Sequence, residues 1–223
     1  AKYRSRPRRT SLANGPCSMF EREALLAVGG FDPSWYHAED MEVSLRLIQA
    51  GGTIVYARDA LVKHVPETGA RHFLAKRRRD ARAHVRIVRH HPKRRRSGPG
   101  FDFLGSSKLV LCMLPLWAVM LMTSLPFLSG LALGESPLDA SILERWEGRL
   151  LGVSLLLFSL TELLLWRGRF GVVNREIMRS TTGSKVVAVL GVRRLTLRWS
   201  LALWHGLLLG LSDALLGRNG HRR

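Results

Sequence analysis

Apolar and polar positions in the N-terminal part of the chain follow two different periods, which together predict a mixed α/β segment. Met41, Leu45 and Ile48 recur at i, i+4 and i+7, and this spacing predicts an amphipathic helix over residues 40–50. A shorter helix is expected over residues 21–28, before a pair of glycines. Short apolar runs predict strands at Cys17–Phe20, Thr53–Ala57 and Leu61–Val65.

The C-terminal half of the chain is dominated by three apolar segments, at about 109–133, 150–166 and 199–217. The first, extended to Gly134, holds no charged residue, and as a helix it would be about 39 Å long, more than a hydrocarbon core of about 30 Å. We therefore expect three parts: a head over residues 1–70, a basic juxtamembrane helix and linker over 71–104, and a membrane region over 105–223. Glu162 and Asp213 are costly in lipid and are either functional or near enough to a segment end to reach the interface.

Positive charge changes the interpretation of the head. The chain has 35 Lys and Arg against 17 Asp and Glu, a formal net charge of +18. Residues 71–96 predict a strongly basic helix, which would attract anionic lipid headgroups by about 1 kcal/mol per cation. Nucleic acid is not expected as a partner, because Phe73 is the only aromatic residue in this stretch for base stacking and an apolar segment follows.

The connections between the apolar segments differ in charge and predict an orientation. Residues 135–147 hold four acidic residues and one basic residue, whereas residues 167–198 hold eight basic residues and one acidic residue. Basic connections favour the cytoplasm, so we expect a multi-pass protein of the inner (plasma) membrane with a cytoplasmic head. If the third segment spans, its basic tail lies outside against this rule; the segment would alternatively lie in the interface, with Trp199 and Trp204 as anchors. A disulfide between Cys17 and Cys112 is not expected, because Cys112 lies inside an apolar run.

Residues 14–64 carry a series of short motifs in a recognisable order: Gly29-Gly30-Phe31-Asp32, Glu39-Asp40, Leu45-Arg46-Leu47, Ala50-Gly51-Gly52 and His64. The set resembles the second half of the catalytic domain of family 2 inverting glycosyltransferases, of the membrane-bound, polysaccharide-extending type. The resemblance covers residues 14–90 well and the rest by layout. It implies an α/β head, the acceptor-side half of a GT-A-like catalytic domain, followed by an α-helical transmembrane region.

The resemblance assigns catalytic roles to Asp40 and Glu39. Inverting transfer needs a carboxylate to take the proton of the acceptor hydroxyl, and a helix N-terminus keeps such a carboxylate ionised. Asp40 would be this base and Glu39 would orient the acceptor or the loop, although Asp40 could equally serve as a helix cap. Acceptor contacts are expected from Gly15, Trp35, Tyr36 and His37; the alternative is that the aromatic loop residues pack against the helix.

Phosphate and metal contacts follow from the same resemblance. Arg78, Arg79 and Arg82 would contact the diphosphate or a lipid phosphate, because guanidinium groups pair well with phosphate oxygens. The Gln-x-x-Arg-Trp motif of the family is absent, and Lys-Arg-Arg-Arg-Asp at 76–80 is its nearest counterpart. His64 is a candidate ligand for a divalent metal, Mg or Mn, or else a structural histidine. An Asp-x-Asp motif is absent from residues 1–38, so we expect a C-terminal fragment that lacks turnover by itself.

The leading hypothesis is a membrane-bound glycosyltransferase that passes a sugar from a nucleotide-sugar donor to a lipid-linked or polysaccharide acceptor of the cell envelope. Its partners would be the donor, the acceptor and membrane lipids. Two alternatives stay open, namely a non-enzymatic basic adaptor that binds anionic lipid and a pseudo-transferase that scaffolds a polysaccharide machine.

Overall fold

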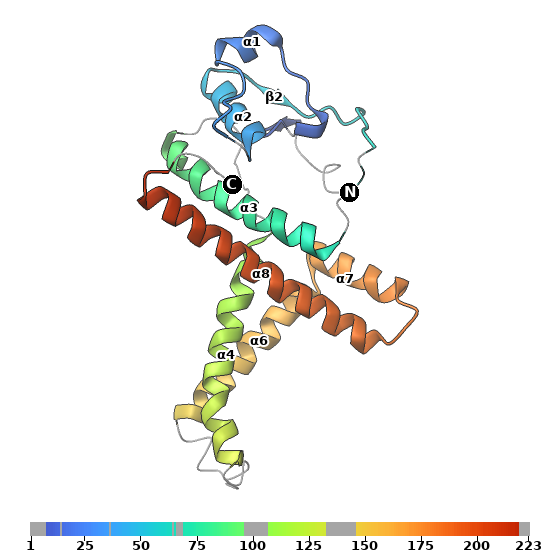
Figure 1. Ribbon diagram of the computed structural model, residues 1–223. Helices are drawn as coiled ribbons and strands as arrows, with labels where there is room; N and C mark the ends of the chain where they lie inside the picture. Colours follow the sequence, from blue (N-terminus) through green and yellow to red (C-terminus); the bar gives the residue numbers. More distant parts are fainter. Residues whose placement is uncertain are drawn as a thin grey trace. The chain divides into compact units, whose positions relative to one another are not determined.

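The computed structural model describes residues 8–13, 15–35, 37–63, 65, 69–95, 107–132 and 146–218 (Figure 1). The chain divides into two compact units. One comprises Ala1–Gly105 together with Ala202–Arg223, and the other comprises Ser106–Leu201. The boundary falls inside the last helix, so that its two halves belong to different units.

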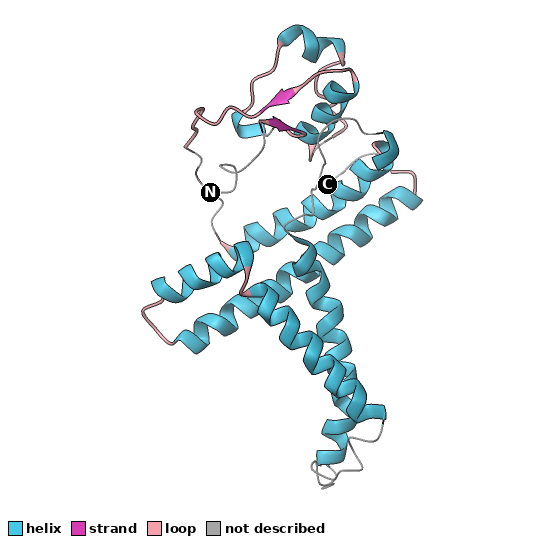
Figure 2. Ribbon diagram, turned by 180° about the vertical axis from the view of Figure 1, so that it is seen from behind, coloured by secondary structure: helices cyan, strands magenta, loops and turns pink. Residues whose placement is uncertain are grey.

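The first unit holds most of the short elements. They are β1 (Arg9–Thr10), η1 (Gly15–Cys17), α1 (Arg22–Ala27), α2 (Glu39–Gln49), β2 (Ile54–Val55), α3 (Ala70–His90) and η2 (Lys93–Arg95). Strands β1 and β2 form one antiparallel pair, with Arg9 opposite Val55 and Thr10 opposite Ile54 (Figure 2).

The helices expected at the start of the chain are confirmed, whereas two of the three strands are wrong. Helices α1 and α2 lie within a residue of the expected bounds, and α3 ends at His90, before the expected end at Arg96. Residues 17–20 form the end of a 3-10 turn and irregular chain, and residues 61–63 and 65 form no strand. An apolar run becomes a strand only where a partner strand completes its hydrogen bonds, and periodicity alone does not supply one. Within the described part of the head, helices therefore outweigh the one short strand pair, and a GT-A-like α/β domain stays a prediction.

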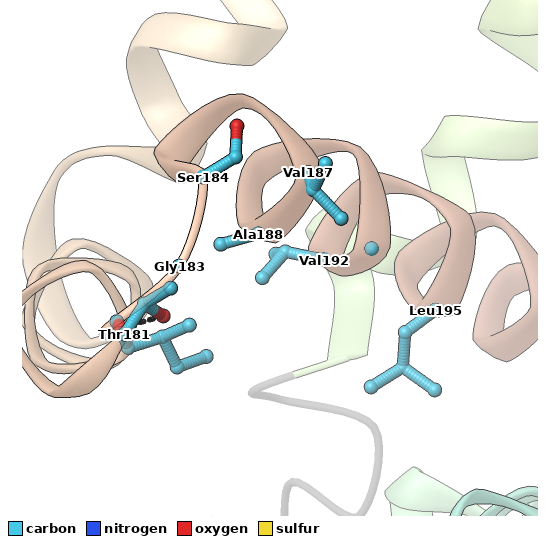
Figure 3. Close-up of a pocket in the computed structure, with 9 residues that line it drawn as sticks. Thr181, Gly183, Ser184, Val187, Ala188, Val192 and Leu195 are labelled. Atoms are coloured by element: carbon cyan, nitrogen blue, oxygen red, sulfur yellow. Dashed lines mark hydrogen bonds between the residues drawn. The ribbon is translucent and has the colours of Figure 1, made fainter.

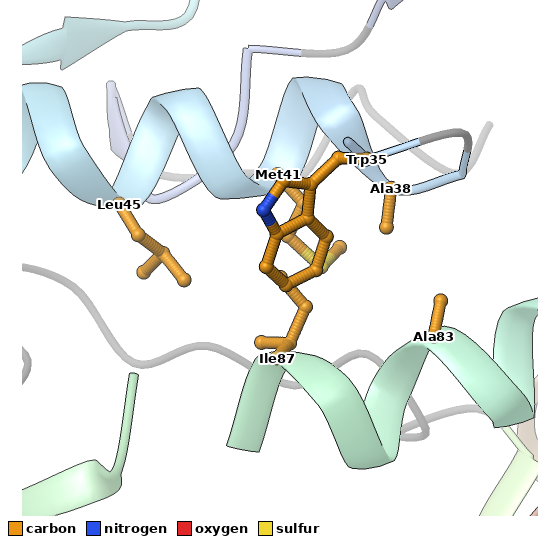
Figure 4. Close-up of a cluster of buried hydrophobic side chains, with 6 residues drawn as sticks. All are labelled: Trp35, Ala38, Met41, Leu45, Ala83 and Ile87. Atoms are coloured by element: carbon orange, nitrogen blue, oxygen red, sulfur yellow. The ribbon is translucent and has the colours of Figure 1, made fainter. Parts of the chain in front are cut away.

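The core of the first unit lies where α2 faces α3 (Figure 4). Met41 and Leu45, one turn apart on α2, point toward Ala83 and Ile87 on α3, and Trp35 lies between the two helices. Full burial of one such large side chain contributes about 1.5–3 kcal/mol. The i, i+4 pattern that predicted α2 thus marks the face that packs against α3, and the small side chain of Ala83 lets the elements approach.

The C-terminal part of the last helix, α8 (Lys185–Leu215), packs against α3 within the first unit. A Cβ added at Gly206 would lie 2.2 Å from the carbonyl oxygen of Arg78, and one at Gly210 would lie 2.8 Å from that of Arg82. Two glycines one turn apart therefore let the two helix backbones touch, as small residues do at close helix crossings.

The second unit is helical over its described residues: α4 (Lys108–Ala132), α6 (Trp146–Leu165), α7 (Gly168–Ser180) and the first half of α8. Helices α4 and α6 lie along each other (Figures 1 and 2). Trp117 meets Phe158 edge-on at 5.8 Å between ring centroids. The hydroxyls of Thr123 and Ser154 lie 2.7 Å apart, which gives each a partner across the helix pair.

Two of the described helices are long and apolar enough to cross a membrane, within Lys108–Leu125 of α4 and Gly148–Leu165 of α6. They coincide with the first two apolar segments predicted from the sequence. The third segment falls inside α8, which does not meet this criterion over its described residues. The basic connection 167–198 is not a loop, since α7 and the start of α8 occupy most of it. Helix α7 is amphipathic, a property that a count of charges alone does not show.

Candidate active site

The candidate site begins at the N-terminus of α2, where the chain before α1 is bound to the helix. The N–H of Gly15 donates to Oδ2 of Asp40 at 3.1 Å. One turn further on, the N–H of Ala13 donates to Oγ of the buried Ser44 at 3.0 Å. Two hydrogen bonds one helical turn apart therefore hold Ala13 and Gly15 along the first two turns of α2.

Glu39 and Asp40 have different surroundings although they are adjacent. Glu39 is exposed, whereas Asp40 is half-buried under Gly15. The N-cap position is Ala38, a left-handed residue with a φ of 65° and no side-chain cap bond, so Asp40 lies in the first turn and is not the N-cap. At that position the partial positive charge of the helix N-terminus favours the ionised carboxylate.

The glycine turn between α1 and α2 is held by one arginine. Arg46 donates to the carbonyl oxygens of Val28 and Gly30, and its other N–H groups bond both carboxylate oxygens of Glu42 at 2.7 Å. The motif containing Arg46 was visible in the sequence, but this role was not. Glu42 was missed altogether, although its i, i+4 spacing from Arg46 is a recognisable signal.

Glu42 is a buried carboxylate with Arg46 and His91 as hydrogen-bonding neighbours. Burial alone would raise its pKa, but hydrogen bonds from His91 and Arg46 outweigh burial and lower the pKa to about 2. The same turn holds Asp32, whose pKa is lowered because the N–H of Ser34 donates to its Oδ1 at 2.8 Å. Both groups therefore stabilise the turn as anions.

Trp35 lies in the core and does not offer a free ring face. It is 6% exposed, the guanidinium carbon of Arg86 lies 3.9 Å from its ring centroid, and His90 meets it edge-on at 5.7 Å. This position agrees with the alternative expectation, in which the aromatic loop residues pack against the helix and do not contact the acceptor. Tyr36, from the same loop, lies outside the described residues.

His37 is bound to α3 through an acidic residue that sequence reasoning did not select. Its Nε2 lies 2.7 Å from Oδ1 of Asp80, and Oδ2 of Asp80 accepts from Arg77 at 2.9 Å. Asp80 thus links the loop before α2 to the basic helix. The two residues are 43 positions apart, and a pairing at that separation has no local signature.

The three candidate phosphate-binding arginines differ in their availability. Arg78 is exposed and Arg79 is half-buried. Arg82 is paired with Asp213 of α8, with Nε 2.6 Å from Oδ2 and Nη2 2.9 Å from Oδ1. The pairing also accounts for Asp213, an acidic residue in an apolar segment, which is neutralised by α3.

The described residues hold no group of three or more His, Cys, Asp or Glu side chains that could bind a metal ion. His64, the expected ligand, lies outside them. The divalent metal, Mg or Mn, therefore stays a prediction from the resemblance.

A separate apolar pocket of about 510 Å³ lies in the second unit, between the end of α7 and the first half of α8 (Figure 3). Its lining includes Ile177, Thr181, Val187, Val192 and Leu195, and it contains no titratable side chain. It offers no group for acid–base or nucleophilic chemistry, so the candidate catalytic groups remain those at the start of α2.

Comparison with known protein families shows which family the chain belongs to. The family model for glycosyl transferase family group 2 matches residues 2–216, nearly the whole chain. The chain belongs to this family. No curated protein and no solved structure matches it. As a family 2 glycosyltransferase, it acts in general on a nucleotide-sugar donor and a glycan acceptor. The match runs from before β1 to beyond the end of α8, so both the head and the apolar helices belong to the family region.

Proposed function

We propose that this family 2 glycosyltransferase moves a sugar from a nucleotide-sugar to a lipid-linked or polysaccharide acceptor with inversion, and that Asp40 is its catalytic base. The observation that carries the proposal is the placement of Asp40. It is a half-buried carboxylate in the first turn of α2 and accepts a hydrogen bond from the backbone of Gly15. The family match supplies the class of reaction.

The chemistry assigned to Asp40 is a single displacement. One carboxylate oxygen accepts the proton of the acceptor hydroxyl while the hydroxyl oxygen bonds to the anomeric carbon, and the bond from that carbon to the nucleoside diphosphate breaks. Because Gly15 donates to Oδ2, this hydrogen bond orients the carboxylate and leaves Oδ1 as the oxygen that we assign to the proton. Exposed Glu39 would orient the acceptor.

The proposal places the protein in the inner membrane with α4 and α6 as membrane spans and the head in the cytoplasm. Two observations support it: the length and apolar composition of both helices and the excess of basic residues in the segment that follows α6. In this arrangement the head would meet cytoplasmic nucleotide-sugars, and the membrane would carry the acceptor.

The test compares Asp40→Asn with Glu39→Gln in the protein expressed from its complete gene. We expect Asp40→Asn to lower the rate of glycan formation by about 10²–10⁴-fold, the usual contribution of a general base, because the amide cannot take the proton. Glu39→Gln, an isosteric change of the exposed neighbour, should cost much less. The measurement is nucleoside diphosphate release and glycan formation by isolated membranes, with a panel of nucleotide-sugars as donors.

Comparable expression and thermal stability of the two variants are the control for folding. Near-normal glycan formation by Asp40→Asn would refute the assignment of the base. If the wild-type protein releases no nucleoside diphosphate from any donor but still binds anionic vesicles, the result favours the adaptor alternative.

A further inference from the structure

The contact between His37 and Asp80 lies next to the start of α2. His37 directly precedes Ala38, the N-cap of α2, so only Ala38 and Glu39 separate it from Asp40 in the sequence. Its Nε2 lies 2.7 Å from Oδ1 of Asp80 on α3, a distance typical of a hydrogen bond to a charged group. All of these residues belong to the first unit.

Asp80 determines which ring nitrogen of His37 carries the hydrogen. Its other oxygen, Oδ2, accepts from Arg77 at 2.9 Å, so the carboxylate is matched by a cation one turn earlier on the same helix. A carboxylate only accepts hydrogen bonds, and the hydrogen in its contact with His37 is therefore on Nε2. In a neutral imidazole, Nδ1 then carries a lone pair and is a hydrogen-bond acceptor.

The ring of His37 is held in place but is not closed off. Its side chain is 20% exposed, whereas Trp35, two residues earlier, is buried in the core. Among the described residues, Asp80 is the hydrogen-bond partner of the ring, and Nδ1 has none. The loop is also fixed at Ser34, whose carbonyl oxygen accepts from Arg86 of α3 at 2.8 Å. A ring fixed in this way loses little conformational freedom when a ligand binds to Nδ1.

We propose that Asp80 is a positioning residue for sugar transfer. It holds His37 in the neutral form with hydrogen on Nε2, and Nδ1 of His37 accepts a hydrogen bond from a hydroxyl of the glycan acceptor. This hydroxyl is not the attacking one, because it keeps its proton, whereas Asp40 takes the proton of the hydroxyl that attacks. The inference rests on the proposed function and adds the atom that recognises the acceptor and the carboxylate that orients it.

The first test asks which nitrogen of His37 is protonated, and it needs no turnover. The protein expressed from its complete gene carries isotope-labelled histidine, in a detergent without a sugar headgroup, and the signals of His37 are identified by their absence from His37→Ala. We expect long-range proton–nitrogen correlation spectra at pH 8.5 to show hydrogen on Nε2 in the wild type. Asp80→Asn should show both forms, since an amide can donate to Nε2 as well as accept from it. Hydrogen on Nδ1 of wild-type His37 would overturn the proposal.

The second test measures sugar transfer to three soluble acceptors: octyl glucoside, octyl galactoside and octyl N-acetylglucosaminide. With the acceptor that the wild type uses best, we expect Asp80→Asn to raise the KM of the acceptor by about two- to tenfold, the contribution of one hydrogen bond. The KM of the donor should not change. Asp59→Asn is the matched control, because it makes the same substitution at an exposed carboxylate of the head, and it should change neither KM.

The positioning role also predicts how two substitutions combine. His37→Ala alone should raise the KM of the acceptor about as much as Asp80→Asn does, and Asp80→Asn should then add little to it, because Asp80 acts through His37. Additive effects, or an unchanged KM of the acceptor in His37→Ala, would show that the contact only stabilises the loop. Thermal unfolding midpoints control for folding, and His37→Ala keeps the test valid if Asp80→Asn does not fold. A wild type that uses none of the acceptors would refute the acceptor contact together with the proposed function, whereas an active wild type with hydrogen on Nδ1 would refute this inference alone.

Discussion

Glu42 and Arg46 show how a single side-chain pair can hold the turn on which the candidate site depends. Arg46 reaches back across the glycine turn to two carbonyl oxygens, and Glu42 keeps its guanidinium in position. His91, just beyond α3, approaches the same carboxylate at 3.5 Å. The pair therefore connects α2 to the turn before it and to the end of α3, and its loss should loosen all three.

The depressed pKa of Glu42 predicts how stability depends on pH. Because the folded pKa of about 2 lies below the ordinary value of 4.5, the ionised carboxylate stabilises the fold above about pH 4.5, and this contribution is lost as the pH falls toward 2. We expect Glu42→Gln to cost about 2–3 kcal/mol at pH 7, since it removes charged hydrogen bonds from a buried site. Thermal unfolding midpoints of the detergent-solubilised protein at a series of pH values measure the difference.

The gap between wild type and Glu42→Gln should narrow as the pH falls below about 4.5. Glu39→Gln is the control, because Glu39 is exposed in the same turn and should change the midpoint little at any pH. A gap that stays constant down to pH 3 would contradict the assigned role of Glu42.

Among the elements, the crossing of α3 and α8 rests on two glycines of α8. A Cβ at Gly206 would lie 2.2 Å from the carbonyl oxygen of Arg78 and 2.8 Å from Cβ of Ala81, so the backbones would have to separate. We expect Gly206→Ala to destabilise the protein by about 1–3 kcal/mol, as overpacking does, even though alanine is the better helix former. The measurement is the thermal unfolding midpoint.

Gly191 is the matched control for this prediction, since it lies in the same helix and a Cβ there would meet nothing within 4 Å. Gly191→Ala should leave the midpoint unchanged or raise it, in line with a gain of up to about 1 kcal/mol in helix propensity. If both substitutions shift the midpoint in the same direction, the close crossing at Gly206 does not limit stability.

The sequence predicts well those helices whose position is determined by a local pattern of apolar residues. The spacing of Met41, Leu45 and Ile48 is enough to place α2, and long apolar runs are enough to place α4 and α6. The strand expected at residues 61–65 is not formed at residues 61–63 and 65, because strand formation depends on a distant partner. The helices within residues 167–198 do not follow from a count of charges, which carries no information on helical periodicity.

The same limit applies to the candidate site. Asp40 and Glu39 could be selected from a motif, and the structure places them in the first turn of a helix, as expected. The pairings of His37 with Asp80 and of Arg82 with Asp213 could not be predicted, because they join residues 43 and 131 positions apart. Only the packing of α2 and α8 against α3 brings these residues together.

For the molecule as a whole, the exposed surface of α4 and α6 favours a bilayer. Leu121, Met122 and Leu125 of α4 and Leu155 and Leu156 of α6 are each more than half exposed, and such a continuous apolar surface is unusual on a protein surrounded by water. Several polar groups of the same unit have internal partners: Thr123 bonds Ser154, and Glu162 pairs with Arg193. Partners of this kind are what a lipid environment requires.

The predicted orientation can be tested with single cysteines, because the natural ones are few. Replacing Cys112 by Ala leaves Cys17, an exposed residue of the head, as the only thiol within residues 1–223. A second variant, Cys17→Ser/Cys112→Ala/Ser141→Cys, carries its only thiol in the acidic connection 135–147.

With a membrane-impermeant maleimide on intact cells, we expect labelling at position 141 and none at Cys17, because acidic connections favour the outside and the basic head favours the cytoplasm. Permeabilised cells should show labelling of both, which controls for reactivity. Labelling of Cys17 in intact cells would reverse the orientation, and with it the proposed access of the head to cytoplasmic nucleotide-sugars.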